Sequence, residues 1–91
     1  MPVIVRVPTV LQKLTDGRDE VHARGGTVGA LIDDLRATHG GFVARITNED
    51  GGVKPFLNVF VNGEDIRFNG ELQAQVKDGD EVSIIPSIAG G

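Results

Sequence analysis

The chain ends in Gly90 and Gly91, and its terminal carboxylate is the reactive group that the sequence presents most openly. Because glycine has no Cβ, two glycines can extend through a narrow channel of another protein and let a reacting carbonyl approach closely. A free carboxylate is a poor acyl electrophile, so such chemistry needs ATP-dependent adenylation by a second protein. Attack of a sulfur donor on the adenylate would then give a thiocarboxylate at Gly91. Chance is the alternative: at average glycine usage a terminal pair arises in roughly one chain in two hundred, and a trimmed chain could also end there.

Other residue types that could do chemistry are sparse. The sequence has no cysteine, which excludes disulfides, thiolate metal sites and a cysteine nucleophile. His22 and His39 lie far apart without a paired ligand, so we expect structural or surface roles and no metal site. We expect Asp33-Asp34 to be solvated on the polar side of a helix. Gly25-Gly26 lacks the G-x-G-x-x-G pattern and the P-loop lysine of a nucleotide site.

Size and composition indicate one folded domain. A chain of 91 residues can form one core and is too short for a separate catalytic domain. The net charge of -4, with Lys and Arg spread along the chain, disfavours nucleic acid as a partner. Residues 1–7 are too short for a signal-peptide core, and nothing approaches the roughly twenty apolar residues of a membrane span. We therefore expect a cytoplasmic protein with no membrane partner.

The N-terminal segment predicts a β-hairpin. Residues 3–7 are rich in β-branched side chains and alternate, so that Val3, Val5 and Val7 share one face of a strand. Thr15-Asp16-Gly17 has turn chemistry, and residues 20–23 return the chain.

One long helix follows the hairpin. Thr27 is a good N-cap, and apolar residues recur at helical spacing over 28–35. We predict that Gly40-Gly41 ends this helix through a left-handed cap. Residues 42–46 then predict a short helical turn that covers the core, followed by a polar, mobile loop at 48–52.

The C-terminal half predicts three more strands. Residues 56–61 alternate in the manner of a strand, and Asn62-Gly63 is a strong hairpin signal leading into a short strand at 65–67. The turn Asp78-Gly79-Asp80 precedes a last strand at 81–85, which Pro86 terminates.

The expected element order is β-β-α-β-β-β, and only one connection contains a helix long enough to join parallel strands. The fold class is therefore α+β: one main helix lying across one mixed sheet, which is the β-grasp arrangement. We expect the domain to span residues 1–86, and residues 87–91 to form a flexible C-terminal tail ending in Gly-Gly.

Several stretches of the chain resemble the ThiS/MoaD family of sulfur carriers. They are VNGEDIRF at 61–68, DGDEVSIIP at 78–86 and IAGG at 88–91, together with VPT at 7–9 and TVGAL at 27–31. The resemblance thus covers essentially the whole chain, and DGDEV with a terminal Gly-Gly is its most specific element. Within the family, VNGEDIRF and PSIAGG look closest to the CysO-type carriers, which deliver sulfide to a cysteine synthase acting on an activated serine.

The resemblance implies a ubiquitin-like β-grasp protein that is not itself an enzyme. In the family the terminal glycine is adenylated and bears the thiocarboxylate, a role that carries over to Gly91, while the tail Ile88, Ala89, Gly90 and Gly91 enters partner active sites. The implied partners are an E1-like activating enzyme of the MoeB/ThiF type and a sulfur-accepting synthase, such as a cysteine, thiosugar or thiazole synthase. The chain itself would bind no cofactor, because the activating enzyme uses the ATP.

A carrier also needs a surface on which its partners dock. Strand alternation places Ile4, Phe60 and Ile85 on the sheet face opposite the helix, where they form a candidate docking face. The family docks through this face near the tail, but scattered exposed apolar residues are also normal. The residues expected to face the helix are Val3, Val5, Val7, Leu57, Val59, Val61, Val82 and Ile84.

The sequence favours a sulfur carrier that serves a cysteine synthase or another sulfur-incorporating enzyme, and a MoaD-like carrier for molybdopterin synthase is the alternative within the same class. Two alternatives come from other classes: a ubiquitin-like modifier that forms isopeptide bonds with lysines, and an interaction module whose glycines are incidental. The recipient pathway and the oligomeric state stay open at this point.

Overall fold

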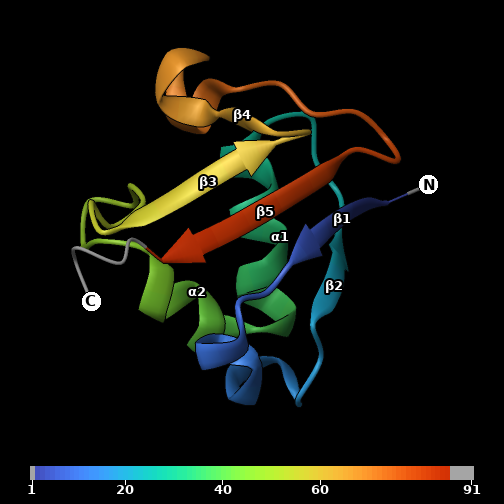
Figure 1. Ribbon diagram of the computed structural model, residues 1–91, viewed down its shortest axis with the longest axis vertical. Coiled ribbons are helices and arrows are strands. Elements are labelled where there is room, and N and C mark those ends of the chain that lie inside the picture. Colours follow the sequence, from blue (N-terminus) through green and yellow to red (C-terminus); the bar gives the residue numbers. More distant parts are fainter. Residues whose placement is uncertain (1, 87–91) are drawn as a thin grey trace.

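Five strands form one mixed sheet, with two helices packed on one of its faces (Figure 1). The computed structural model describes residues 2–86; Met1 and residues 87–91 lie outside the described part. The strand order is β2-β1-β5-β3-β4, in which β1 and β5 are parallel and the other pairs are antiparallel. The strands are β1 (Val3–Arg6), β2 (Glu20–Ala23), β3 (Leu57–Val61), β4 (Glu64–Asp65) and β5 (Glu81–Pro86).

The predicted alternation of the strands is confirmed by their burial. In β1, Val3 and Val5 are buried whereas Arg6 is exposed. The same period places Val82 and Ile84 of β5 against the helices. Seven of the eight predicted helix-facing residues are buried, at most 5% exposed, and Val61 packs partly buried against the core. We call the other side of the sheet the open face; its strand residues are Ile4, Arg6, Glu20, His22, Asn58, Phe60, Glu81, Ser83 and Ile85.

The connection between β1 and β2 is partly helical, whereas the sequence indicated only a turn at Thr15-Asp16-Gly17. The antiparallel pairing is confirmed, from Val3 opposite Ala23 to Arg6 opposite Glu20. The segment between them contains a 3-10 helix, η1 (Thr9–Thr15), that the sequence analysis missed. Thr15 is fully buried, and its hydroxyl bonds the carbonyl oxygens of Gln12 and Arg18 at 3.2 and 2.9 Å.

The main helix, α1 (Val28–Thr38), begins as predicted. The Thr27 hydroxyl accepts a hydrogen bond from the Ala30 N–H at 3.1 Å, which is the expected N-cap. The prediction for its end is wrong: neither Gly40 nor Gly41 has a positive φ, and both belong to the second helix, α2 (Gly40–Ile46). The chain turns instead at His39, with φ -136° and ψ 57°.

The short helix α2 covers the core, as predicted. Phe42, Val43 and Ile46 are at most 2% exposed. Their burial gives the physical reason why the chain resumes a helix after His39 instead of ending in a loop.

The hairpin of β3 and β4 turns where the sequence predicted. Asn62 and Gly63 both have positive φ, 50° and 87°, as a two-residue hairpin turn requires. The short fourth strand is shifted from the predicted 65–67 to Glu64–Asp65, because Ile66–Phe68 forms a 3-10 helix, η2, which buries Ile66. A further 3-10 helix, η3 (Glu71–Gln73), follows.

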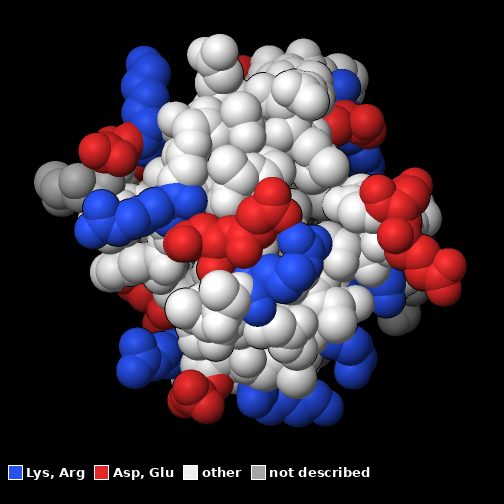
Figure 2. Space-filling view, turned by 180° about the vertical axis from the view of Figure 1, so that it is seen from behind, with Lys and Arg blue, Asp and Glu red and all other residues white. Residues whose placement is uncertain are grey.

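The element order and the single helical layer confirm the predicted β-grasp arrangement. The helix side of the molecule carries interspersed acidic and basic side chains (Figure 2). Among residues 2–86, no helix has the length and apolar character needed to cross a membrane.

Candidate functional site

The strand that leads to the chain terminus is held on both sides. β5 pairs with β1 through residues 81–83 and with β3 through residues 82–86, where Pro86 is opposite Leu57. The predicted tail residues Ile88, Ala89, Gly90 and Gly91, including the reactive Gly91, lie outside the described residues. The structure therefore describes the platform from which this tail departs.

The start of β5 is tied to the hairpin turn of β3 and β4. The Asn62 side-chain oxygen accepts a hydrogen bond from the Glu81 N–H at 3.0 Å, and the Asn62 N–H donates to the Glu81 carbonyl at 2.8 Å. A hydrogen bond with the Asn62 side chain, together with the Lys77 N–H, lowers the pKa of Asp80. These contacts join the VNGED and DGDEV stretches, so the two motifs form one structural unit that sets the position of β5.

The three predicted docking residues all lie on the open face. Ile85 is 48% exposed, while Ile4 and Phe60 are partly exposed. Their neighbours on the same strands, Val5, Val59 and Ile84, are buried against the helices. The placement expected from strand alternation is confirmed, whereas docking through these residues stays a prediction.

The sheet register brings only two of these residues close together. Phe60 is opposite Ser83, two residues from Ile85, which corresponds to a diagonal separation of roughly 7–8 Å. Ile4 is opposite Glu81, four residues from Ile85, and thus roughly 13 Å away along the strand direction. The apolar part of the open face is therefore a pair, Phe60 and Ile85, at the end of β5 from which the tail departs.

A charged row separates Ile4 from this pair. Arg6 forms ion pairs with Glu20 at 3.0 Å and with Glu81 at 3.3 Å. The hydrogen bond with Glu81, more than any other interaction, raises the pKa of Arg6. His22 lies 3.1 Å from the other carboxylate oxygen of Glu20. Because these groups are exposed, they contribute polarity to the surface more than stability to the fold.

Two exposed aromatic residues were not identified as surface features from the sequence. Phe56 precedes β3 and is 44% exposed, with the Lys54 Nζ 5.9 Å from its ring centre. Phe68 is 87% exposed. A strand at 65–67 would have placed Phe68 on the same side as Ile66, but a 3-10 helix has three residues per turn and directs the two side chains apart. A short segment of this kind leaves no periodic signal in the sequence.

The remaining candidates have structural partners. Asp33 pairs with Arg36 on the surface of α1, and the Asp34 carboxylate accepts a hydrogen bond from the Arg24 N–H at 2.9 Å. A Cβ on Gly25 would lie 2.8 Å from the Ala30 Cβ, so Gly25 allows close packing at the start of the helix. Within residues 2–86, no group of three or more His, Cys, Asp or Glu side chains could hold a metal ion.

Comparison with known proteins agrees with this architecture. The chain is 43% identical to the sulfur carrier protein CysO of Mycobacterium tuberculosis, over the full length of both proteins. A chain in the crystal structure of the Amycolatopsis orientalis BexX/CysO complex is 47% identical, with a TM-score of 0.89 over 98% of this chain and 99% of the other. The small archaeal modifier protein 3 of Haloferax volcanii is 40% identical over 71% of this chain and 70% of its own length.

The fold and these similarities define a ubiquitin-like β-grasp protein. The model of the ThiS family matches residues 5–91, and the chain belongs to the ThiS family. The relatives that it matches are named as small carrier or modifier proteins.

Proposed function

We propose that this protein is a sulfur carrier whose Gly91 carboxylate is converted to a thiocarboxylate. The carboxylate attacks the α-phosphate of ATP with loss of pyrophosphate, and a sulfide donor then displaces AMP from the acyl carbon. The resulting sulfur anion attacks an electrophilic carbon held by an acceptor enzyme, either displacing a leaving group from that carbon or adding to its double bond. Hydrolysis of the thioester then releases the sulfur with the product and returns the Gly91 carboxylate. The observation that carries the proposal is the full-length similarity to sulfur carriers, together with a family match that reaches Gly91.

The proposal assigns two partners to the protein. An E1-like enzyme of the MoeB/ThiF type binds the ATP and activates the terminus, and a biosynthetic enzyme accepts the sulfur. A cysteine synthase is the leading acceptor, and a thiosugar or thiazole synthase is the other. The crystallised complex of a relative with BexX supports docking on a second protein. The exchange belongs in the cytoplasm, where ATP is available, and the chain itself binds no cofactor.

The platform described above suits this role. β5 pairs with β1 over residues 81–83 and with β3 over residues 82–86, and it ends beside the exposed Ile85. A rigid globule that carries an apolar surface beside a narrow terminal segment can dock first and then place Gly91 in a partner's active site. We assign this docking to Phe60 and Ile85, with residues 1–86 as the globule and Ile88, Ala89, Gly90 and Gly91 as the segment that enters.

Intact-mass spectrometry tests the proposal directly. The protein is incubated with ATP, sulfide and a cognate activating enzyme. The activity of this enzyme has been shown separately. We expect a mass increase equal to the replacement of one oxygen by sulfur, and no change for a variant lacking Gly91. An unchanged mass of the full-length chain would refute the carrier role.

The similarity to a small archaeal modifier protein supports a second candidate, covalent modification of lysines. The same adenylated Gly91 would then form isopeptide bonds. This reading predicts adducts of higher mass that persist under denaturing and reducing conditions and contain no sulfur. Immunoblotting of cell extracts under these conditions, with the Gly91 deletion as the control, separates the two candidates.

A further inference from the structure

The backbone of the last three residues of β5 is paired on one side only. β1 ends at Arg6, and its pairing with β5 stops at Ser83. Residues 84–86 therefore depend on β3 for their backbone pairing, and the first residue of β3, Leu57, lies opposite Pro86. The position of Pro86, the last described residue before the chain terminus, thus depends on the start of β3.

The register pair of Leu57 and Pro86 lies beyond the last hydrogen bonds between the two strands. At the other end of this ladder, the Asn62 N–H donates to the Glu81 carbonyl at 2.8 Å. Because hydrogen-bonded and non-hydrogen-bonded pairs alternate in an antiparallel ladder, residues 58 and 85 exchange hydrogen bonds, whereas Leu57 and Pro86 do not. Pro86 also has no N–H to donate. The final pair of the ladder is therefore fixed only by whatever holds Leu57.

Arg67 holds Leu57 from the side away from β5. Its guanidinium donates to the Leu57 carbonyl at 3.1 Å and to the Pro55 carbonyl at 3.3 Å. The Leu57 N–H donates to the Lys54 carbonyl at 3.0 Å, so both backbone groups of Leu57 have partners on this side. The Asp65 carboxylate accepts a hydrogen bond from the Arg67 N–H at 2.9 Å and lies 3.9 Å from the guanidinium. Asp65 thereby helps to direct the side chain that makes these bonds.

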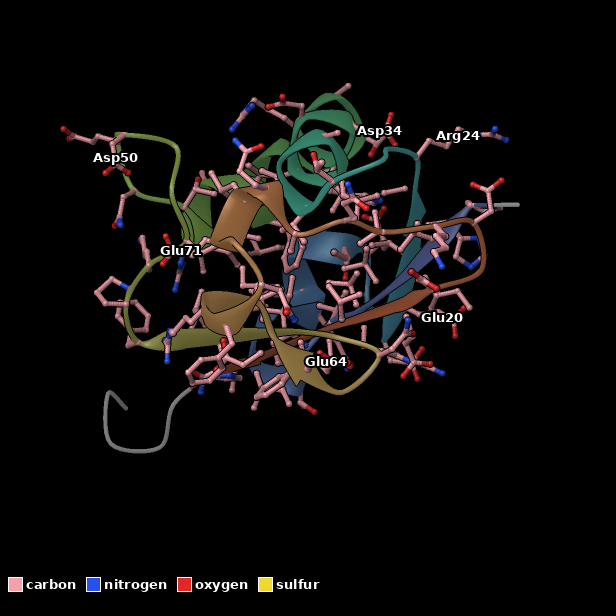
Figure 3. The ribbon with its side chains drawn as sticks, turned by 90° about the horizontal axis from the view of Figure 1, so that it is seen from above. Glu20, Arg24, Asp34, Asp50, Glu64 and Glu71 are labelled. Atoms are coloured by element: carbon pink, nitrogen blue, oxygen red, sulfur yellow. The ribbon has the colours of Figure 1, made fainter. Side chains whose placement is uncertain are left out.

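The Arg67 side chain spans a groove of about 610 Å³. One wall is the loop that carries Asp50 and leads into β3, and the other is the segment after β4 that carries Glu71 (Figure 3). Arg67 belongs to η2 on the second wall, whereas the carbonyls that it bonds lie on the first wall, at the entry into β3. Its side chain is 46% exposed. Loss of the guanidinium would therefore loosen the start of β3 without opening a cavity in the core.

We propose that Arg67 is a positioning residue for sulfur transfer: by fixing Leu57, it keeps Pro86 in the register from which the terminus enters a partner's active site. The inference rests on the proposed function, because delivery of Gly91 is the step that it serves. Residues 87–91 span at most about 18 Å when extended, so a change of direction at Pro86 is magnified at the reacting carbonyl. A misplacement of about 1 Å at reacting atoms can lower a rate about a hundredfold.

Docking should not depend on Arg67. Ile85 of the docking pair lies opposite Asn58 in a hydrogen-bonded position, one residue inside the pair that Arg67 controls. Phe60 lies further inside the same ladder. We therefore expect Arg67 to affect the rate within the bound complex and to leave the affinity of the complex nearly unchanged.

Steady-state kinetics of adenylation test this inference. The initial rate of pyrophosphate release by a cognate activating enzyme is measured over a range of carrier concentrations. We expect Arg67→Met to lower kcat about tenfold and to leave KM within about twofold, because a bound but misdirected terminus reacts more slowly. Arg67→Lys keeps a cationic donor and should restore kcat to within about threefold of the wild type.

A matched control removes a different exposed arginine. Arg36 pairs with Asp33 on the surface of α1, and its side chain is 51% exposed. Arg36→Met should leave kcat and KM within about twofold, since exposed ion pairs contribute little. An unchanged kcat for Arg67→Met, an equal loss for Arg36→Met, an effect confined to KM, or no recovery with Arg67→Lys would each overturn the inference.

Amide hydrogen exchange separates the positioning role from a general loss of stability. In the ¹⁵N-labelled full-length chain, we expect Arg67→Met to speed exchange of the Leu57 amide about tenfold, because its segment opens locally. The Glu81 amide, held by the Asn62 side chain at the other end of the ladder, should exchange at its wild-type rate. Equally faster exchange at both amides would show a merely structural role and overturn the inference.

Failure of this inference is distinguishable from failure of the carrier role. If the wild-type chain acquires the thiocarboxylate and Arg67→Met acquires it at the same rate, the carrier role stands and the positioning role falls. If the mass of the wild-type chain never changes, the carrier role falls, and the positioning role falls with it whatever the amide exchange shows.

Discussion

Ile84 and Ile85 are consecutive isoleucines on one strand, yet they lie in opposite environments. Ile84 is 5% exposed and packs in the core, whereas Ile85 is 48% exposed on the open face. The period of two in a β-strand produces this difference, because successive side chains point to opposite sides of the sheet. The comparison shows that β5 separates two requirements: its inner face stabilises the fold, and its outer face is available for a partner.

The largest expected effect tests the inner face. We expect Ile84→Ala to lower the free energy of unfolding by about 2–5 kcal/mol, because the deletion loses buried apolar contact and leaves a cavity in the core. Urea denaturation followed by circular dichroism measures this change. The matched substitution Ile85→Ala should cost less than about 1 kcal/mol. Equal costs for the two variants would contradict the separation of the faces.

The second effect sharpens the comparison on the open face itself. If Phe60 and Ile85 form the docking pair, Ile85→Ser should weaken binding to the activating enzyme about tenfold, because the few residues that cost more than about 1 kcal/mol on truncation cluster at the centre of an interface. Ile4 lies on the same face beyond the Arg6 ion pairs, so Ile4→Ser should leave Kd within about twofold. Isothermal titration calorimetry measures both. Equal losses of affinity for Ile85→Ser and Ile4→Ser would instead support a docking face in which Ile4, Phe60 and Ile85 act together.

The smallest effect concerns the opposite end of β5. Hydrogen bonding lowers the pKa of Asp80 below its ordinary value of 3.8 in the folded protein, so its ionised form stabilises the fold above that pH. This contribution is lost as the pH falls through the folded-state pKa. We therefore expect the stability difference between the wild type and Asp80→Asn to be largest near neutral pH and to shrink below pH 3.8. Denaturation curves across this range measure it, and a difference independent of pH would contradict this role for the carboxylate.

Local signals in the sequence predicted the elements that depend on neighbouring residues. The Thr27 cap and the Asn62-Gly63 turn both form as expected, because each interaction closes within a few residues. The left-handed cap at Gly40-Gly41 was wrong, although α1 ends just before these residues, and the short fourth strand is shifted from 65–67 to Glu64–Asp65. The two differences have a shared reason. There, burial of Phe42 and of Ile66 beneath other parts of the chain outweighed the local preference.

For the candidate site too, the sequence predicted the local features and missed those that depend on strand pairing. The sequence placed Ile4, Phe60 and Ile85 on one face correctly, since alternation is a local property. Their separation depended on which strands pair and in what register, and that brought Arg6 and Ser83 between Ile4 and Ile85.

By itself, the sequence determined the period of each strand, the cap of the main helix and the terminal diglycine motif that points to Gly91, since these follow from residue types within a few positions of one another. Only the tertiary structure decided which surface residues become neighbours, because strand order and register bring together segments that the chain separates. That decision left Phe60 and Ile85 as a pair and joined Asn62 to the start of β5.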